Sequence, residues 1–217
     1  MTNRTDHVAL TATELSYLLT VESELTTVGR RAADVLGLTE PERDRPGLAA
    51  GLSSLLVRGL VVSDGQRVTL APTVGAVTQA LRGSTTNVQI GFVSKDKSDG
   101  ALVFDAGSVR VLITPRLHRC FDAVGLDHRA GLAGQLVHMS REFLQRFRPG
   151  VVSAVMDTTG SGRAEDLKWA TVSTDAEAWS VGFSRDPAQA ETGLTETQAF
   201  ERLLDHFVQL LGDLRPA

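Results

Sequence analysis

The sequence contains a single cysteine and no long run of apolar residues. One cysteine, Cys120, excludes an intramolecular disulfide, which suits a reducing compartment. No apolar stretch reaches the roughly 18 residues that a membrane-spanning helix requires. The first residues, Met1 to His7, lack the apolar core of a signal peptide. We therefore expect a cytoplasmic protein that makes no membrane contact.

No strong field of either sign surrounds this chain. The formal net charge is -4 and the isoelectric point is about 5.7, which gives no attraction for nucleic acid or for an anionic membrane. The hydrophobic fraction of 42% and the charged fraction of 22% are those of an ordinary globular protein. A length of 217 residues fits one large domain or two small ones.

A complete phosphate-binding motif is also missing. Gly160-Ser161-Gly162 resembles a fragment of such a loop, but a Walker A loop ends in Gly-Lys-Ser/Thr. Here Arg163-Ala164-Glu165 follows instead, and the carboxylates of Glu165 and Asp166 would repel phosphate. We interpret the segment as a connection between strands.

Metal and nucleophile signatures are equally weak. None of the five histidines pairs at a metal-ligand spacing, and zinc needs about four ligands brought together. Cys120 lies two residues after His118, but a lone cysteine between such neighbours is more often a small buried hydrophobe. We expect no metal, no cofactor and no catalytic residue, and an enzyme with an unrecognised site is left as one alternative.

The first part of the chain has helical periodicity. Apolar residues recur at three- and four-residue steps from Leu10 to Leu38 and again from Pro46 to Gly59. Two short β runs, Leu60 to Val62 and Arg67 to Leu70, surround a turn containing Asp-Gly, and a helix from Pro72 to Arg82 follows. Helices followed by a hairpin are the order of a winged helix.

A winged helix suggests DNA binding, yet the charges oppose it. In the helix that would enter the groove, the polar residues between Leu48 and Arg58 are only Ser53, Ser54 and Arg58. Residues 1–82 hold eight arginines against nine acidic residues, a net charge of -1, where a DNA reader needs a basic face. Arg45 and Arg58 remain candidates for contacting a partner.

After Gly83 the period changes from helical to two, because Val88, Ile90 and Phe92 alternate with polar or small residues. The remaining pattern predicts strands at 102–104, 109–113, 151–156, 167–173 and 178–183, a short helix at Arg116 to Val124, long helices at Gly131 to Phe147 and Thr195 to Leu214, and a loop at Pro187 to Gly193. The fold class is therefore α+β, with β-β-β-α occurring twice in antiparallel meanders. We divide the chain into residues 1–83, winged-helix-like, and 84–217, antiparallel α+β, and expect them to pack as one unit.

Trp169 is the third candidate for binding a partner. It would share a strand face with Leu167, Thr171 and Ser173, a mixed set that leaves its burial open. An exposed tryptophan on a sheet is a strong anchor for another protein.

One family resemblance rests on the segment from Ala49 to Val61, which reads AAGLSSLLVRGLV. The turn Ser63 to Gln66, the helix Leu70 to Leu81 and the opening Leu10 to Leu15 accompany it. Together these resemble the N-terminal half of the EspG family of type VII (ESX) secretion-associated proteins. The resemblance implies a cytosolic chaperone that holds the hydrophobic helical tip of a secreted substrate.

Three hypotheses follow. The first is a non-catalytic cytosolic module that binds a protein, similar to type VII secretion chaperones. The second is a winged-helix DNA-binding regulator with a C-terminal sensor or dimerisation domain. The third is an enzyme. A broad apolar groove would favour the first, a basic stripe the second, and a pocket with convergent ionisable groups the third. A homodimer is left open.

Overall fold

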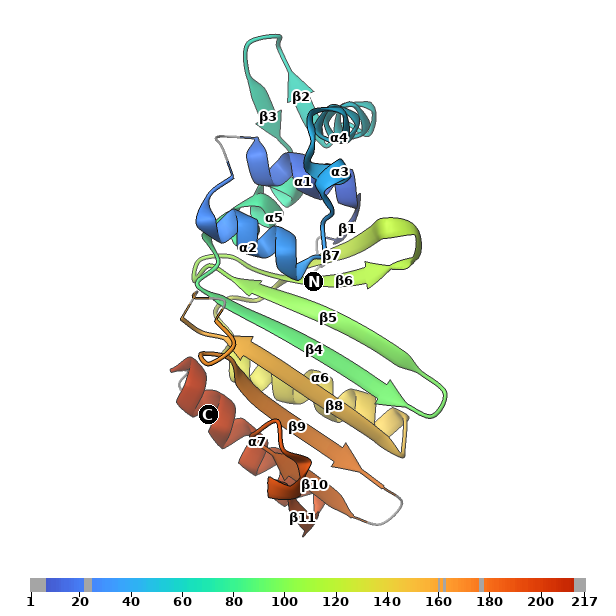
Figure 1. Ribbon diagram of the computed structural model, residues 1–217, viewed down its shortest axis with the longest axis vertical. Helices are drawn as coiled ribbons and strands as arrows, with labels where there is room; N and C mark the ends of the chain where they lie inside the picture. The colour runs from blue at the N-terminus through green and yellow to red at the C-terminus, as the bar shows by residue number, and fades with distance from the viewer. Residues whose placement is uncertain (1–6, 22–24, 160, 162, 176–177, 213–217) are drawn as a thin grey trace, which may run out of the picture. The chain divides into compact units, whose positions relative to one another are not determined.

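The computed structural model describes residues 7–21, 25–159, 161, 163–175 and 178–212 (Figure 1). The chain divides into two compact units, which we call unit 1 (Met1–Thr85 and Leu102–Leu126) and unit 2 (Thr86–Ala101 and Asp127–Ala217). Strand β5, Ser98–Asp105, begins in unit 2 and ends in unit 1. The subdomain boundary predicted between residues 83 and 84 stays a prediction.

Unit 1 is a set of antiparallel strands in the order β1-β7-β6-β5, with helices packed on one face. Its elements are β1 (His7–Thr11), α1 (Ala12–Thr20), α2 (Thr27–Val35), α3 (Glu40–Arg43), α4 (Arg45–Val57), β2 (Val61–Ser63), β3 (Val68–Leu70), α5 (Pro72–Gly83), β6 (Arg110–Arg116), the 3-10 turn η1 (Leu117–Arg119) and β7 (Cys120–Leu126). The strands β2 and β3 form a separate hairpin beside α4.

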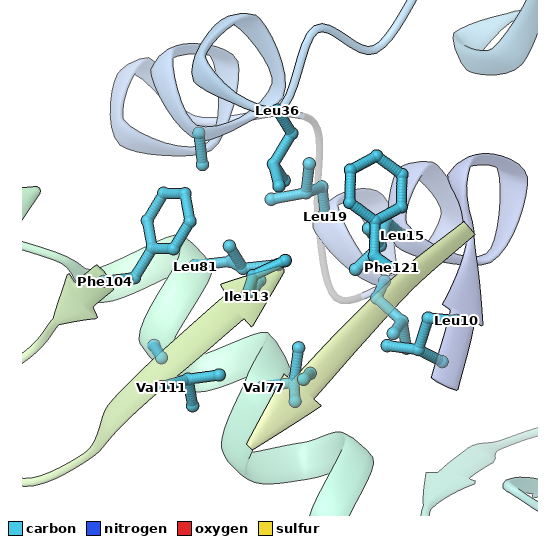
Figure 2. Close-up of a cluster of buried hydrophobic side chains, with 14 of the residues drawn as sticks. Leu10, Leu15, Leu19, Leu36, Val77, Leu81, Phe104, Val111, Ile113 and Phe121 are labelled. Atoms are coloured by element: carbon cyan, nitrogen blue, oxygen red, sulfur yellow. The ribbon is translucent and has the colours of Figure 1, made fainter. Parts of the chain in front are cut away.

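The hydrophobic core of unit 1 lies between α1, α2 and α5 and the inner face of these strands (Figure 2). The helices contribute Leu15, Leu19, Leu36, Val77 and Leu81, and the strands contribute Leu10, Phe104, Val111, Ile113 and Phe121. On β6 and β7 every second residue points inward, which is the period that a half-buried strand requires.

A buried carboxylate joins α1 to α4. The side chain of Glu14 is fully buried, and its oxygens accept hydrogen bonds from the Thr11 amide at 2.8 Å, the Ser54 hydroxyl at 2.7 Å and the Arg58 guanidinium at 2.8 Å. The second terminal nitrogen of Arg58 donates to the carbonyl of Ala9 at 2.7 Å. A buried charge is tolerated only when it is paired and hydrogen-bonded in this way.

Gly51 allows α4 to approach α1 closely. A Cβ atom on this residue would lie 2.1 Å from the carbonyl oxygen of Thr13, so any side chain would force the helices apart. The contact brings the backbone of α4 against the first turn of α1, where Glu14 then reaches Ser54 and Arg58 on the next turns of α4.

Unit 2 has antiparallel strands in the order β4-β8-β9-β10-β11, with two long helices on one face (Figure 1). Its elements, besides the start of β5, are β4 (Thr86–Ser94), α6 (Leu132–Arg146), β8 (Gly150–Asp157), β9 (Lys168–Thr174), β10 (Trp179–Gly182), the 3-10 turn η2 (Pro187–Gln189), β11 (Glu191–Leu194) and α7 (Glu196–Leu211). Aromatic contacts attach the helices, because Phe143 of α6 packs on Phe92 and Phe200 of α7 packs on Trp179.

The predicted α+β class, with antiparallel strands and long amphipathic helices, is confirmed. Thr195 and Gln198 form the expected capping box at the start of α7. The order α2, α3, α4 and hairpin β2–β3 is that of the expected winged-helix-like segment, whose assignment as a winged helix stays a prediction.

Three element assignments were wrong. The helix expected from Arg116 to Val124 is the turn η1 followed by strand β7, because Phe121 and Ala123 point into the core while Asp122 points out. Leu10, assigned to a helix, lies on strand β1. Part of the loop expected at Pro187 to Gly193 is strand β11. Each of the two predicted β-β-β-α repeats therefore contains four strands before its helix rather than three.

A salt bridge holds the strained turn η1. Both His118 and Arg119 have a φ of 59°, a conformation that costs L-residues roughly 1–2 kcal/mol each. The Arg119 guanidinium donates two hydrogen bonds to the Glu42 carboxylate, at 2.8 and 2.6 Å, and one to the Gly37 carbonyl. The bond from Arg119 lowers the pKa of Glu42 from its ordinary 4.5 to about 2, against the opposing effect of burial.

We predict that Gly51→Ala destabilises the protein by about 3 kcal/mol, because its methyl group overlaps the Thr13 carbonyl. Gly75→Ala is the matched control, since Gly75 lies in helix α5 and its Cβ position would meet only Leu70 Cβ, at an ordinary contact distance of 4.0 Å. That control should stabilise by roughly 0.5–1 kcal/mol, the ordinary helix preference for alanine. Urea unfolding measures both, and equal effects of the two substitutions would contradict the close contact.

We also predict that Glu42 contributes stability above pH 4.5 that is lost as the pH falls towards 2, because the folded state binds the proton less readily than the unfolded state. Glu42→Gln keeps a side chain that can cap α3 but removes the charge. The difference in unfolding free energy between wild type and Glu42→Gln should therefore shrink between pH 4.5 and 2. Glu201→Gln on the exposed face of α7 serves as control. A difference that does not change with pH would refute the assignment.

Candidate functional site

In the described part of unit 2, α6 and α7 cover one face of the strands, and we call the opposite face the open face. At β10 the segment around Pro187 and Ala190 lies over the edge of this face. The open face consists of alternate residues on four neighbouring strands: Gln89, Gly91 and Val93; Val151, Ser153 and Val155; Trp169, Thr171 and Ser173; Ser180 and Gly182. The intervening residues, such as Val152, Val172 and Val181, are at most 2% exposed. They face α6 and α7, which contact β8, β9 and β10.

The register sets these residues in rows across the strands. Val93, Val151, Ser173 and Ser180 lie opposite one another in one row. Gly91, Ser153, Thr171 and Gly182 form the next row, and Gln89, Val155 and Trp169 form the third. The open face is therefore uncharged, with small residues at its centre and larger apolar side chains at its border.

Two shallow grooves follow this face. The first has a volume of about 300 Å³ and lies between Thr171, Ser173, Ser180 and the segment 184–187. The second, of about 320 Å³, lies between Val93, Lys95, Val151 and the same two serines. Because both grooves share Ser173 and Ser180, they form one continuous depression. Its ionisable groups stand at opposite ends, Arg185 and Asp186 at one and Lys95 and Asp175 at the other.

Apolar side chains border the depression. Val93 is 50% exposed and Val151 is 39% exposed, although both lie on strands. On a solvent-facing strand surface, charged residues would be more usual than two exposed valines in direct register. The arrangement suits an apolar partner surface better than bulk water.

Trp169 lies on the open face. The sequence had left open whether this side chain is buried or exposed. Its ring is half-buried, and the guanidinium of Arg185 lies 4.7 Å from the ring centroid in a cation–π contact. Within the described part of the chain its indole nitrogen is buried without a hydrogen-bond partner. Trp169 forms one rigid edge of the face, and its role in binding a partner stays a prediction.

Arg45 and Arg58, the other two candidates, lie at opposite ends of α4. Thirteen helical residues span about 20 Å, so the two guanidinium groups do not form one site. Arg58 is occupied by Glu14 and the Ala9 carbonyl, which gives it a structural role. Arg45 is exposed at the first turn. That either residue contacts a partner is still a prediction.

The sequence reading missed most of the open face. Its signal was present, because uncharged residues occupy every second position of β8, β9 and β10 where charged ones would be typical. Arg185, which covers Trp169, lies outside any strand and gave no signal.

Other site types are not formed by the residues that the structure describes. Among them, no three His, Cys, Asp or Glu side chains gather as metal ligands. Gly160 and Gly162 of the Gly-Ser-Gly loop lie outside the described residues. Within the same residues, no helix is both long and apolar enough to cross a membrane.

Comparison with protein-family models and with curated protein sequences finds no match. Among solved structures, the chain is similar to the type VII secretion system chaperone EspG5 of Mycobacterium tuberculosis, determined in complex with a PE25–PPE41 dimer. The TM-score is 0.59 at 9% sequence identity, and the match covers 96% of this chain and 97% of EspG5. The resemblance to the EspG family seen in the sequence is therefore confirmed at the level of the fold: this chain folds as the secretion chaperone EspG5 does.

Proposed function

We propose that this protein is a non-catalytic, cytosolic chaperone that binds a helical segment of a secreted protein on the open face of unit 2. The observation that carries the proposal is the open face itself, an uncharged strand surface with exposed valines in a fold shared with a secretion chaperone. EspG5 was determined with a PE25–PPE41 dimer bound, which supports a protein partner for the present chain.

The dimensions of the open face suit a helix. Four strands spaced about 4.8 Å apart present a surface roughly 15 Å wide, while an α-helix with side chains is about 10–12 Å across. The row of Gly91, Ser153 and Thr171 lets a helix backbone come close, while Gly182 at the end of this row is buried beside Ala190. The border formed by Val93, Val151, Val155 and Trp169 would cover the apolar stripe of that helix.

The hydroxyl groups in the depression add specificity without charge. Thr171, Ser173 and Ser180 can each donate or accept a hydrogen bond at its floor. An apolar helix carrying a few polar residues would satisfy them, whereas a nucleic acid would meet no row of basic side chains. A chaperone of this kind keeps an aggregation-prone apolar helix covered until the partner is exported.

We predict that Thr171→Arg, at the centre of the open face, abolishes partner binding. The test is affinity purification of the tagged full-length protein from its native cytosol, with nuclease present, read by mass spectrometry. Wild type should recover a helical secreted protein, and Thr171→Arg should recover at least about tenfold less, because a guanidinium would be buried without a partner. Equal folding of the two proteins is checked by their thermal unfolding.

Thr114→Arg is the matched control, since Thr114 is also a half-buried threonine on a strand, but in unit 1. It should leave recovery unchanged. Loss of the partner with both substitutions, or a partner lost on nuclease treatment, would contradict binding on the open face. Recovery of the same partner by Thr171→Arg at wild-type level would do so equally.

A further inference from the structure

The outer side of α4 and the hairpin β2–β3 form a second apolar surface, which we call the α4 patch. Three of the eight exposed large hydrophobic residues among the described ones lie there: Leu56, Val57 and Val62, with exposed fractions of 38%, 89% and 65%. Val68, which is 37% exposed, points to the other face of the hairpin, because it pairs with Ser63 while Val62 pairs with Thr69. The hairpin packs directly beside α4 (Figure 1). The patch belongs to unit 1 and is distinct from the open face of unit 2.

Helix α4 is unusual because it is apolar on its exposed side. Only Gly47, Gly51 and Leu55 of this helix are buried, while Ala49, Ala50, Ser53, Leu56 and Val57 face solvent. A surface helix normally turns charged residues outward. Here the inward side is occupied by the Gly51 contact with α1, and the apolar outer side is exposed.

The spacing of the outward residues is that of a paired helix. Pro46, Ala50, Ser53 and Val57 follow one another at steps of four, three and four, the repeat that lines the seam between two helices. The middle of the outer side of α4 holds the small residues Ala49, Ala50 and Ser53, so two helices can approach closely there. Larger side chains, Leu56 and Val57, lie towards one end.

We propose that the α4 patch is the interface of a homodimer, in which α4 of two chains pack antiparallel about a two-fold axis near Ser53. This pairing is self-complementary, because it places the large Leu56 and Val57 of one chain opposite the small Ala49 and Ala50 of the other. A symmetric pair of identical surfaces is the commonest way in which soluble proteins dimerise.

The charges favour the antiparallel direction. Arg45 is exposed at the start of α4, next to Asp44, whose carboxylate caps the helix through the Gly47 amide. Antiparallel pairing brings each Arg45 to the C-terminal end of the partner's helix, where the charge of Arg58 is balanced by Glu14 and the helix dipole is negative. The exposed hairpin turn that carries Asp64 follows shortly after this end. Parallel pairing would set the two Arg45 side chains against each other.

The same surface does not suit DNA. Of the two arginines of α4, Arg58 is bound to Glu14 and only Arg45 is directed to solvent at the start of the helix. Base readout in the major groove needs Arg, Lys, Asn or Gln along the exposed side of the helix. The helix order that suggested DNA binding thus presents an apolar rather than a basic outer side.

The size of the patch predicts a weak dimer. Helix α4 is about 20 Å long, and α4 with the two strands is roughly 20 Å wide. This outline of about 400 Å² is half of the roughly 800 Å² per partner that a standard specific interface buries, which is the size of a weak, transient contact. Dissociation in the micromolar range or above is expected, so the dimer must be sought at high concentration.

Sedimentation velocity of the full-length protein from about 5 to about 500 µM tests the dimer. Wild type should show a reversible shift from monomer to dimer. Val57→Asp should raise the dissociation constant more than about tenfold, because it buries a carboxylate at the seam. Leu117→Asp is the matched control, since Leu117 is 82% exposed on the turn η1 of the same unit. A wild type that stays monomeric, or a dimer unaffected by Val57→Asp, would overturn the proposal.

A cysteine placed at the axis tests the geometry. In a Cys120→Ser background, Ser53→Cys should form a disulfide-linked dimer under mild oxidation much faster than Gln209→Cys on the exposed side of α7. Equal rates would exclude the antiparallel α4 pairing. A wild type that binds duplex DNA, with binding lost in Val57→Asp and no dimer seen, would assign the patch to nucleic acid and refute the homodimer. Thr171→Arg should dimerise normally, which separates this test from that of the proposed function.

Discussion

In unit 2 the helices cover only one face of the strands, and the properties of the candidate site follow from this. Side chains on a strand point alternately to the two faces, so each strand here carries one set for the core and one for the open face. The core set is valine, alanine, methionine and tryptophan, packed under α6 and α7. The other set is uncharged, with small residues at its centre. Facing water is costly mainly for the exposed valines Val93 and Val151, which lie opposite each other at the border.

In unit 1 the equivalent constraint is the close approach of α4 to α1. Gly51 permits the contact, and the buried carboxylate of Glu14 then holds Ser54 and Arg58 of α4. The two features depend on each other, because the hydrogen bonds require the short distance and the buried charge requires the hydrogen bonds. This contact turns Gly51 and Leu55 of α4 inward and thereby leaves Leu56 and Val57 outward. The apolar α4 patch is thus a direct consequence of how the helix is anchored.

Both proposals assign a binding role to a surface of this protein, but the two surfaces differ in the partner that they suit. The open face is wide, with a shallow depression lined by hydroxyl groups, which suits a helix of another protein. The α4 patch is a narrow seam with small residues at its centre, which suits its own copy. Because they belong to different units and share no residue, a substitution in one tests that surface alone.

Local patterns in the sequence were sufficient for the fold class, the long helices α6 and α7, the capping box at Thr195 and the alternation along β4 and β8. They failed at Arg116 to Val124 and at Leu10, where a short apolar segment has no period long enough to separate strand from helix. Strands β1 and β7 form because they pair with each other, although they lie near opposite ends of the sequence of unit 1. No local signal encodes a pairing between such distant segments.

By itself the sequence determined the features that depend on periodicity or on neighbouring residues, namely helix faces, caps and turns. It also showed that complete catalytic motifs are absent from the sequence. Only the tertiary structure decided which face of the strands α6 and α7 leave uncovered, that Trp169 borders it beneath Arg185, and that Arg58 binds the buried Glu14. The reason is physical. Alternation shows that a strand has two kinds of face, but which of them a helix covers depends on contacts between residues that are distant in the chain.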